Sequence, residues 1–484
     1  MKHLRKTLTL SLLAPLMVLT GCVSYPLVAL EPKEITNTYK DYMSHHYENL
    51  DSCPSLGKPN LLVIPIWFTD SSKYISNQAD TRNRIQKAYF GTNKETGWRS
   101  VSSYYDELSG GKLQIDGTVS GWYACGRASS YYYQDVGKTM ALVNEAVDWY
   151  RSSTGDSLKS FDYDKNGYLD GVMLIYGSPD YATMKNQNAS NMWAYCYWMS
   201  GNSKNVNQPN ANSFFWASYD FMDGDTRFAG IDTHTYIHEM GHVLGLEDYY
   251  DYSSQYSPAG GFSMQDYNVG SHDPHSVLGL GWANALVPTK SCKVELHDFQ
   301  SSKEIIILSP NYTGSPFDEY FILELYSATG LNEFDCKHRY ENKYPIGPSY
   351  PGIRLWHIDA RLLEVRNRKI VDFTTKVEEG KKYTMAMSNT YYGKEGRQYI
   401  SPLGQGYANY NILQLIRNSK KETYKPEYVI GTTDLFRTYD SFSMKNYKSQ
   451  FVNGTKLNNG KSLGWSFKVN SIQENTATIT LIKG

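Results

Sequence analysis

The sequence lacks an excess of charge of either sign. Its 48 lysines and arginines are matched by 49 aspartates and glutamates, which gives a formal net charge of -1 at pH 7. Binding to nucleic acid requires a basic face, so this balance gives no indication of a nucleic-acid partner. After residue 21 the chain also lacks any apolar run long enough to span a bilayer, and it contains no internal repeat.

Cysteine is scarce, with six residues in 484. Cys22 belongs to the N-terminal targeting segment, and the other five are Cys53, Cys125, Cys196, Cys292 and Cys336. These five can pair outside the cytoplasm, but an odd number leaves one thiol over or paired with another chain. None of them has the short spacing of a zinc ribbon, so a metal site in this chain has to depend on histidine.

Histidine occurs only 11 times, yet two copies lie four residues apart in the run His238-Glu-Met-Gly-His-Val-Leu-Gly-Leu-Glu-Asp248. On a helix this spacing places both imidazoles on one face, close enough to bind one zinc ion. Glu239, beside that ion, can take a proton from water and pass it to a leaving amine. The run predicts peptide-bond hydrolysis; the alternative is a solvated helix with core histidines.

Catalytic zinc has three protein ligands and one open position, so His238 and His242 need a partner. Gly245 can adopt a left-handed conformation and end the helix, after which the chain can turn back and direct Asp248 at the metal. Asp248 is therefore the predicted third ligand.

A glycine pair precedes Met264 in a loop rich in tyrosine and serine, Gly260-Gly-Phe-Ser-Met264. A tight turn there would place Met264 under the metal, in a pattern that resembles the methionine turn of metzincins. Simple packing of a flexible apolar side chain is the alternative. Beyond this turn, Tyr267 and His272 are candidates for the donor that stabilises the oxyanion.

Asp248 stands where most metzincins have a third histidine, and in this the chain resembles the immune inhibitor A-like zinc metallopeptidases. The resemblance extends to residues 100–113, with a Ser-x-x-x-Tyr-Tyr pattern, to a strand at 114–122, to the Leu-Gly-Trp sequence at 280–282 and to residues 352–359. It covers roughly residues 60–360. It implies a zincin-type catalytic domain that acts on proteins or peptides.

A second stretch, residues 162–170, alternates oxygen-bearing side chains and has glycine at its sixth position. This pattern lets a short loop wrap a hard cation, and it predicts a structural calcium site. The ligands assigned to it are Asp162, Asp164, Asn166, the carbonyl of Tyr168, and Asp170. The twelfth position is Met173 in place of the glutamate of an EF-hand, and a cation-free loop of Asx-turns is the alternative.

The N-terminus reads as a targeting signal. Basic residues precede a short apolar run at 8–19, which is followed by Leu19-Thr-Gly-Cys22. This sequence resembles a bacterial lipobox, which implies cleavage before Cys22, acylation of its sulfur and a membrane anchor. We expect export to the bacterial cell envelope or surface; an ordinary secretory signal is the alternative.

The predicted fold class is α+β, with four segments. A signal peptide (1–21) and a tether or short prosegment (22–57) precede the catalytic domain (58–288), and a β-rich, sandwich-like region (289–484) follows. A plain linker is the simpler interpretation of 22–57, although Cys53 could silence the metal as a thiolate. In the β-rich region, His357 and Asp359 share one strand face, where a structural pair is favoured over a role at the active-site rim.

Together these patterns predict a secreted, lipid-anchored zinc metalloendopeptidase of extracellular proteins, with Glu239 as general base. The alternative is a surface lipoprotein for adhesion or glycan binding on an inactive peptidase scaffold. Such a protein would use its 42 tyrosines, whose amphipathic rings stack on peptides and sugars.

Overall fold

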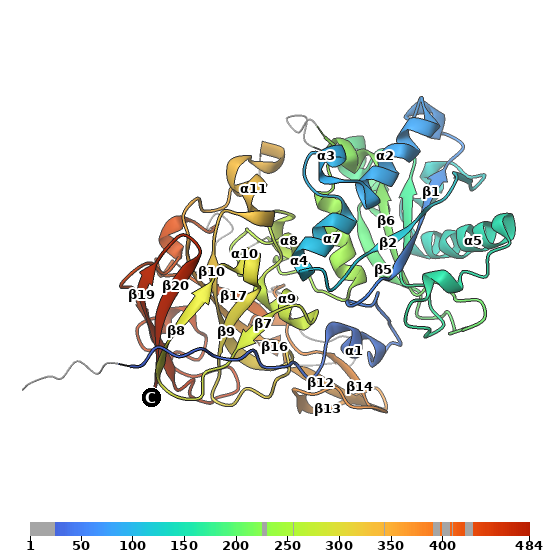
Figure 1. The fold of residues 1–484 in the computed structure, drawn as a ribbon. Helices are drawn as coiled ribbons and strands as arrows, with labels where there is room; N and C mark the ends of the chain where they lie inside the picture. Colours follow the sequence, from blue (N-terminus) through green and yellow to red (C-terminus); the bar gives the residue numbers. More distant parts are fainter. Residues whose placement is uncertain are drawn as a thin grey trace, which may run out of the picture.

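The fold is that of a computed structural model, which describes residues 25–224, 230–254, 256–342, 344–390, 397–398, 407–408, 410–421 and 429–484. The signal peptide and Cys22 lie outside the described residues. Figure 1 shows a half with helices around a sheet and a second half made mainly of strands. The mixed α and β architecture with a β-rich second half agrees with the predicted class.

The first half is built on a six-stranded sheet in the order β2-β1-β4-β6-β5, with β3 also paired to β1. Only β5, at one edge, runs antiparallel to its neighbour. The strands are β1 (Asn60–Trp67), β2 (Asp116–Val119), β3 (Tyr123–Ala124), β4 (Val172–Tyr176), β5 (Tyr195–Trp198) and β6 (Ser213–Ser218). Strand β1 is a continuous apolar run because helices cover both faces of the sheet.

Alternate residues of β1 belong to two different hydrophobic clusters. Leu61 and Val63 pack with α2 (Gln78–Phe90), α4 (Val101–Ser109) and α7 (His234–Val243). Leu62 and Ile64 pack with α5 (Val136–Thr154) on the opposite face. The helix that carries the histidine pair is therefore pressed against the sheet from one side. The shorter helices of this half are α3 (Asn93–Thr96), α6 (Tyr181–Met184), α8 (Met264–Tyr267) and α9 (Pro274–Gly279).

The second half contains a five-stranded sheet, β17-β11-β10-β9-β7, and a four-stranded sheet, β18-β19-β20-β8. The first comprises β7 (Asn284–Leu286), β9 (Glu304–Leu308), β10 (Glu319–Tyr326), β11 (Gly352–Asp359) and β17 (Leu413–Ile416). The second comprises β8 (Cys292–His297), β18 (Ser441–Phe442), β19 (Trp465–Ile472) and β20 (Thr476–Lys483). One cluster contains side chains of both sheets, which pack face to face as the sandwich-like prediction expects.

The other face of the five-stranded sheet joins the core of the first half. Along β10, Phe321 and Leu323 point into the sandwich, whereas Tyr320 and Ile322 belong to the same cluster as helix α7. Strand β7 belongs to this sheet, so its strands start at Asn284, ahead of the predicted domain boundary after residue 288. The remaining elements are β12 (Leu362–Arg366), β13 (Lys369–Thr374), β14 (Lys382–Met385), β15 (Arg397–Gln398), β16 (Tyr407–Ala408), α10 (Phe299–Ser302) and α11 (Glu333–Lys337).

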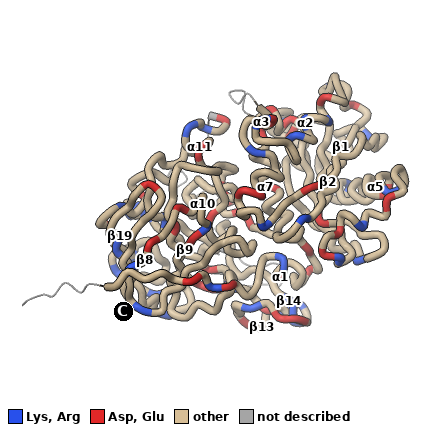
Figure 2. The backbone as a smooth tube through the Cα atoms, viewed as in Figure 1, with Lys and Arg blue, Asp and Glu red and all other residues tan. Residues whose placement is uncertain are grey.

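Charged residues of both signs are interspersed along the chain in both halves (Figure 2).

Inside the sandwich, His357 bonds to Glu319 (3.0 Å) and Asp359 bonds to Arg361 (2.7 Å). The predicted pair of His357 with Asp359 is therefore wrong, because each residue bonds to a different partner. The five cysteines after Cys22 are all free thiols. Among the described helices, none is both long and apolar enough to cross a membrane.

Residues 25–57 are packed into the fold and do not form a loose tether. The backbone of Val28 donates to Lys293 (2.9 Å) at β8, and helix α1 (Tyr39–Ser44) follows between the two halves. Further on, the backbone of Cys53 donates to Val243 (2.8 Å), at the end of α7. This segment therefore links both halves to the helix that carries the histidine pair.

The hypothesis that Cys53 blocks the metal as a thiolate is wrong. Its side chain is fully buried and donates to the carbonyl of Pro54 at 3.6 Å. Burial and nearby carboxylates raise the pKa of the thiol well above its ordinary value, so it stays protonated. Cys53 is not a member of the group of described side chains that can hold a metal ion.

Replacement of Tyr39 by alanine should destabilise the whole protein. The ring is 0% exposed and packs on Phe317, with ring centroids 5.5 Å apart, and its hydroxyl bonds to His275 at 3.0 Å. We expect Tyr39→Ala to lower the free energy of unfolding by about 3 kcal/mol or more, as for other buried aromatic truncations. The measurement is urea denaturation. Leu27→Ala, at a side chain that is 64% exposed, is the control. Equal urea midpoints for both variants would mean that residues 25–57 do not contribute to the stability of the fold.

Candidate metal centre

Helix α7 ends where the sequence predicts that it should. It spans His234–Val243, and Gly245 then adopts a left-handed conformation with φ of +98°. A Cβ at this glycine would lie 2.8 Å from the Cγ atom of Met43 in α1, so the close packing of the N-terminal segment also requires glycine here. The reversal at Gly245 brings Asp248 back toward the histidine pair.

The three predicted ligands converge on one point. The Nε2 atoms of His238 and His242 are 3.1 Å apart, and the Oδ1 atom of Asp248 lies 3.1 and 3.2 Å from them. Among the described residues, these three form the group of side chains that could hold a metal ion. Tetrahedral zinc with bonds of about 2.0–2.1 Å needs ligand atoms roughly 3.3–3.4 Å apart. The triangle of atoms therefore fits zinc and leaves a fourth position free.

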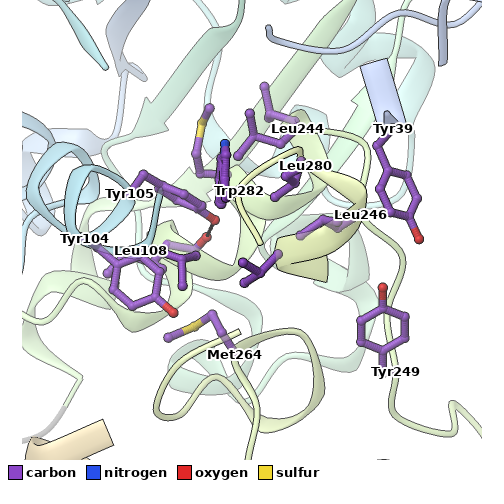
Figure 3. Close-up of a cluster of buried hydrophobic side chains, with 14 of the residues drawn as sticks. Tyr39, Tyr104, Tyr105, Leu108, Leu244, Leu246, Tyr249, Met264, Leu280 and Trp282 are labelled. Atoms are coloured by element: carbon purple, nitrogen blue, oxygen red, sulfur yellow. Dashed lines mark hydrogen bonds between the residues drawn. The ribbon is translucent and has the colours of Figure 1, made fainter. Parts of the chain in front are cut away.

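Backbone carbonyls orient both imidazoles. The Nδ1 atom of His238 lies 2.7 Å from the carbonyl of Met264, and that of His242 lies 2.8 Å from the carbonyl of Leu246. Because a carbonyl can only accept, Nδ1 carries the proton and the lone pair of Nε2 faces the metal position. The side chain of Met264 is fully buried, in the same cluster as Tyr104 and Leu108 (Figure 3).

Glu239 lies beside the ligands in a buried position, 6% exposed. The backbone of Cys196 in the edge strand β5 faces its carboxylate and lowers the pKa of that group. Its Oε2 atom and the Oδ1 atom of Asp248 have no hydrogen-bond partner among the described residues. Buried polar atoms are rarely left unpaired, and these two oxygens are where a metal ion and a water molecule would be needed.

Burial raises the pKa of Glu239 above its ordinary value, which favours proton uptake near neutral pH. Burial also raises the pKa of Asp248, but the charge of a protonated His242 and hydrogen bonds from both rings, whose place a bound metal ion would take, outweigh it and hold this pKa well below the ordinary value. Asp248 therefore remains an anion, as a metal ligand must.

Neither candidate for the oxyanion donor is bonded to the ligands in the described contacts. The ring of His272 is fully buried, with Nδ1 3.0 Å from the hydroxyl of Tyr104 and Nε2 3.1 Å from Oε1 of Gln265. Tyr267 packs on Tyr344, with ring centroids 6.1 Å apart. The role of both residues stays a prediction.

Two tyrosines that sequence reasoning missed lie next to the ligands. The hydroxyl of Tyr252 donates to Oδ2 of Asp248. The ring of Tyr250 stacks on His238, with centroids 6.5 Å apart. No local pattern signalled either residue, because Tyr250 lies at a bend and Tyr252 lies in a turn, so their directions depend on the fold.

The predicted calcium loop uses its oxygens for other contacts. The carboxylate of Asp162 accepts from the backbone of Asn166 (2.9 Å) and Gly167 (3.0 Å), and that of Asp170 accepts from Tyr163 (3.0 Å). Such contacts are typical of the Asx-turn alternative. These contacts therefore do not support a bound calcium ion at this loop.

A lysine from the N-terminal segment supplies positive charge at this loop. The Nζ atom of Lys40 lies 2.9 Å from Asp164, 2.6 Å from Asp51 and 2.6 Å from the carbonyl of Ser52. Asp51 also accepts from the side chain of Asn166 at 2.9 Å. The ammonium group thus neutralises Asp164, one of the carboxylates that the sequence pattern assigned to a cation.

The first residue of α7 is held by the β-rich half. The ring of His234 lies between Trp98 and Tyr340, with centroids 4.3 and 4.2 Å away. Its Nδ1 atom is 2.8 Å from Asp232 and its Nε2 atom is 3.3 Å from Asp335, which precedes β11 in the chain. Burial lowers the pKa of His234, but Asp335 and Asp232 outweigh this effect and raise it to about 10.

Comparison with known proteins identifies a family for the part of the chain that contains this site. The family model of the immune inhibitor A peptidase M6 catalytic domain matches residues 67–272, which confirms the expected resemblance over these residues. The matched segment contains His238, Glu239, His242 and Asp248.

Two curated relatives match part of this chain. Both are the pre-pro-metalloprotease PrtV, from the M66-2 and the ATCC 39315 / El Tor Inaba N16961 strains of Vibrio cholerae serotype O1. Each is 27% identical over 201 residues, which cover 36% of this chain and 21% of the relative. The match thus spans about a fifth of the length of these relatives. Together the similarities support a metallopeptidase, and a metallopeptidase implies a metal ion.

Loss of the Lys40 ammonium should destabilise the fold, whereas calcium should not stabilise it. We expect Lys40→Met to lower the free energy of unfolding by about 2 kcal/mol, as for hydrogen bonds to charged groups. Millimolar calcium should leave the melting temperature of the wild type unchanged. The measurements are urea and thermal denaturation, with the exposed Lys58→Met as control. A clear rise in melting temperature with calcium would restore the calcium assignment.

The imidazole of His234 should remain protonated at pH 8. Because its pKa of about 10 lies above the ordinary value of 6.5, its protonation stabilises the fold fully below pH 6.5 and less as the pH approaches 10. NMR of protein labelled with ¹³C in its histidines, assigned with His234→Gln, measures this directly. A titration midpoint of His234 near pH 6.5 would contradict its contacts with Asp232 and Asp335.

Proposed function

We propose that this chain, whose residues 67–272 match the immune inhibitor A peptidase family, is a zinc metalloendopeptidase that cleaves exported or extracellular proteins. The observation that carries the proposal is the triangle formed by His238, His242 and Asp248, with the buried carboxylate of Glu239 beside it. Two imidazoles and one carboxylate with an open fourth position are a ligand set of catalytic zinc.

Each residue of the site has one role. His238, His242 and Asp248 hold the metal, and the carbonyls of Met264 and Leu246 fix the two rings. Zinc, when bound there, lowers the pKa of a water molecule toward about 7 and polarises the scissile carbonyl.

Glu239 moves the proton. Its unpaired Oε2 atom accepts the proton of the attacking water and then passes it to the nitrogen of the leaving amine. Tyr267 and His272 remain candidates for the donor to the oxyanion.

The location of the enzyme is part of the proposal. Leu19-Thr-Gly-Cys22 resembles a lipobox, which supports export, acylation of Cys22 and attachment to a membrane of the bacterial envelope. An adhesion or glycan-binding protein on an inactive scaffold is the alternative. The intact set of ligands and base argues against it, because a scaffold kept only for binding has no need of Glu239.

Replacement of Glu239 by glutamine should abolish proteolysis and leave metal binding intact. The change keeps the size of the side chain and removes its ability to take a proton. With soluble protein that begins after Cys22, we expect cleavage of casein to fall at least about 10²-fold, the low end of what general-base catalysis contributes. Zinc content, measured by mass spectrometry, should equal that of the wild type.

The matched control is Glu474→Gln, the same change at an exposed position of the β-rich half. It should cut casein like the wild type. Equal cleavage by the wild type and by Glu239→Gln would show that Glu239 is not the base. A wild type that binds glycans strongly and leaves casein and gelatin intact would favour the binding protein.

A further inference from the structure

The two carboxylate oxygens of Asp248 face different partners. Oδ1 lies 3.1 Å from His238 and 3.2 Å from His242, where a metal ion would bind. Oδ2 accepts a hydrogen bond from the hydroxyl of Tyr252. Only one of the two oxygens is therefore free for the metal.

We propose that Tyr252 positions the third metal ligand and keeps Asp248 bound through a single oxygen. The inference deepens the proposed function and rests on it. A carboxylate with both oxygens free can occupy two positions around a metal ion. Catalytic zinc, by contrast, needs an open position beside three protein ligands. With Oδ2 engaged by the phenol, Asp248 contributes Oδ1 alone, and the fourth position remains for water and substrate.

The loop that carries Tyr252 is fixed in place. Asp251 accepts from the backbone of Ser253 (3.0 Å) and of Tyr256 (3.1 Å), which closes a turn around Tyr252. The ring of Tyr250 contacts the ring of Tyr252 edge to face, with centroids 4.9 Å apart. The direction of the Tyr252 hydroxyl is thus set by its own turn and by a neighbouring ring.

The β-rich half also holds this loop. The side chain of Asn389 donates to the carbonyl of Tyr249 at 2.8 Å and to that of Leu413 in β17 at 2.9 Å. The residue that precedes the tyrosine pair is therefore tied to a strand of the second half. The hydrogen bond from Tyr252 to Asp248 connects this supported loop to a predicted metal ligand.

The hydroxyl can be removed without disturbing the core. Tyr252 is 62% exposed, so phenylalanine at this position creates no cavity and loses only the hydrogen bond to Asp248. Tyr447→Phe is the matched control, because the Tyr447 hydroxyl donates to Asn418 at 2.7 Å within the β-rich half.

The experiment measures metal binding and coordination, independently of proteolysis. Zinc affinity of the full chain after Cys22 is measured by competition with a chelator, and the visible absorption of the cobalt-loaded protein reports the coordination of the metal. For Tyr252→Phe we expect the zinc dissociation constant to rise about 10-fold or more, as for other residues that orient metal ligands. The cobalt spectrum should change in shape and intensity. Tyr447→Phe should match the wild type in both measurements.

Failure of the inference and failure of the proposed function give different results. A wild-type zinc affinity and cobalt spectrum in Tyr252→Phe, while His242→Ala no longer binds, would overturn the role of Tyr252 and leave the metal site intact. A wild type that binds neither metal, or that binds both equally well after His242→Ala, would overturn the proposed function itself.

Discussion

The candidate metal site depends on the chain reversal at Gly245. Its three predicted ligands come from eleven consecutive residues, and they can meet only if the helix stops after His242 and the chain returns at once. The left-handed conformation at Gly245 makes that return. The absent Cβ also leaves room for Met43, so the N-terminal segment packs directly beneath the turn. One residue thus satisfies a backbone requirement and a packing requirement together.

Residues of the β-rich half hydrogen-bond to the segment around Met264, so this half supports the candidate site. Asp335 accepts from the backbone of Gly270 (2.6 Å) and Arg354 donates to the carbonyl of Phe262 (3.2 Å), on either side of Met264. The carbonyl of Met264 in turn orients His238. Together with the bond from Asn389 to Tyr249, these contacts brace the segments that follow α7.

Local patterns were enough to predict which three side chains converge and where the main strands lie. The spacing of His238 and His242, the conformational freedom of Gly245 and the apolar run in β1 act over a few residues, and the structure has each as expected. The integration of residues 25–57, the contact of Lys40 with the acidic loop and the bond from Tyr252 to Asp248 were not predicted. The contacts of residues 25–57 and of Lys40 join parts of the chain that lie far apart in the sequence. The bond from Tyr252 to Asp248 depends on the direction of a side chain.

The long-range contacts of α1 have a consequence for the order of folding. The hydroxyl of Tyr42 accepts from the backbone of Met385 (3.0 Å), and the loop after the third ligand is tied through Asn389 to Leu413. Chains emerge from the ribosome and from export machinery with the N-terminus first. The surroundings of the candidate metal site therefore cannot close until most of the chain has emerged, so the three predicted ligands are brought together late in folding.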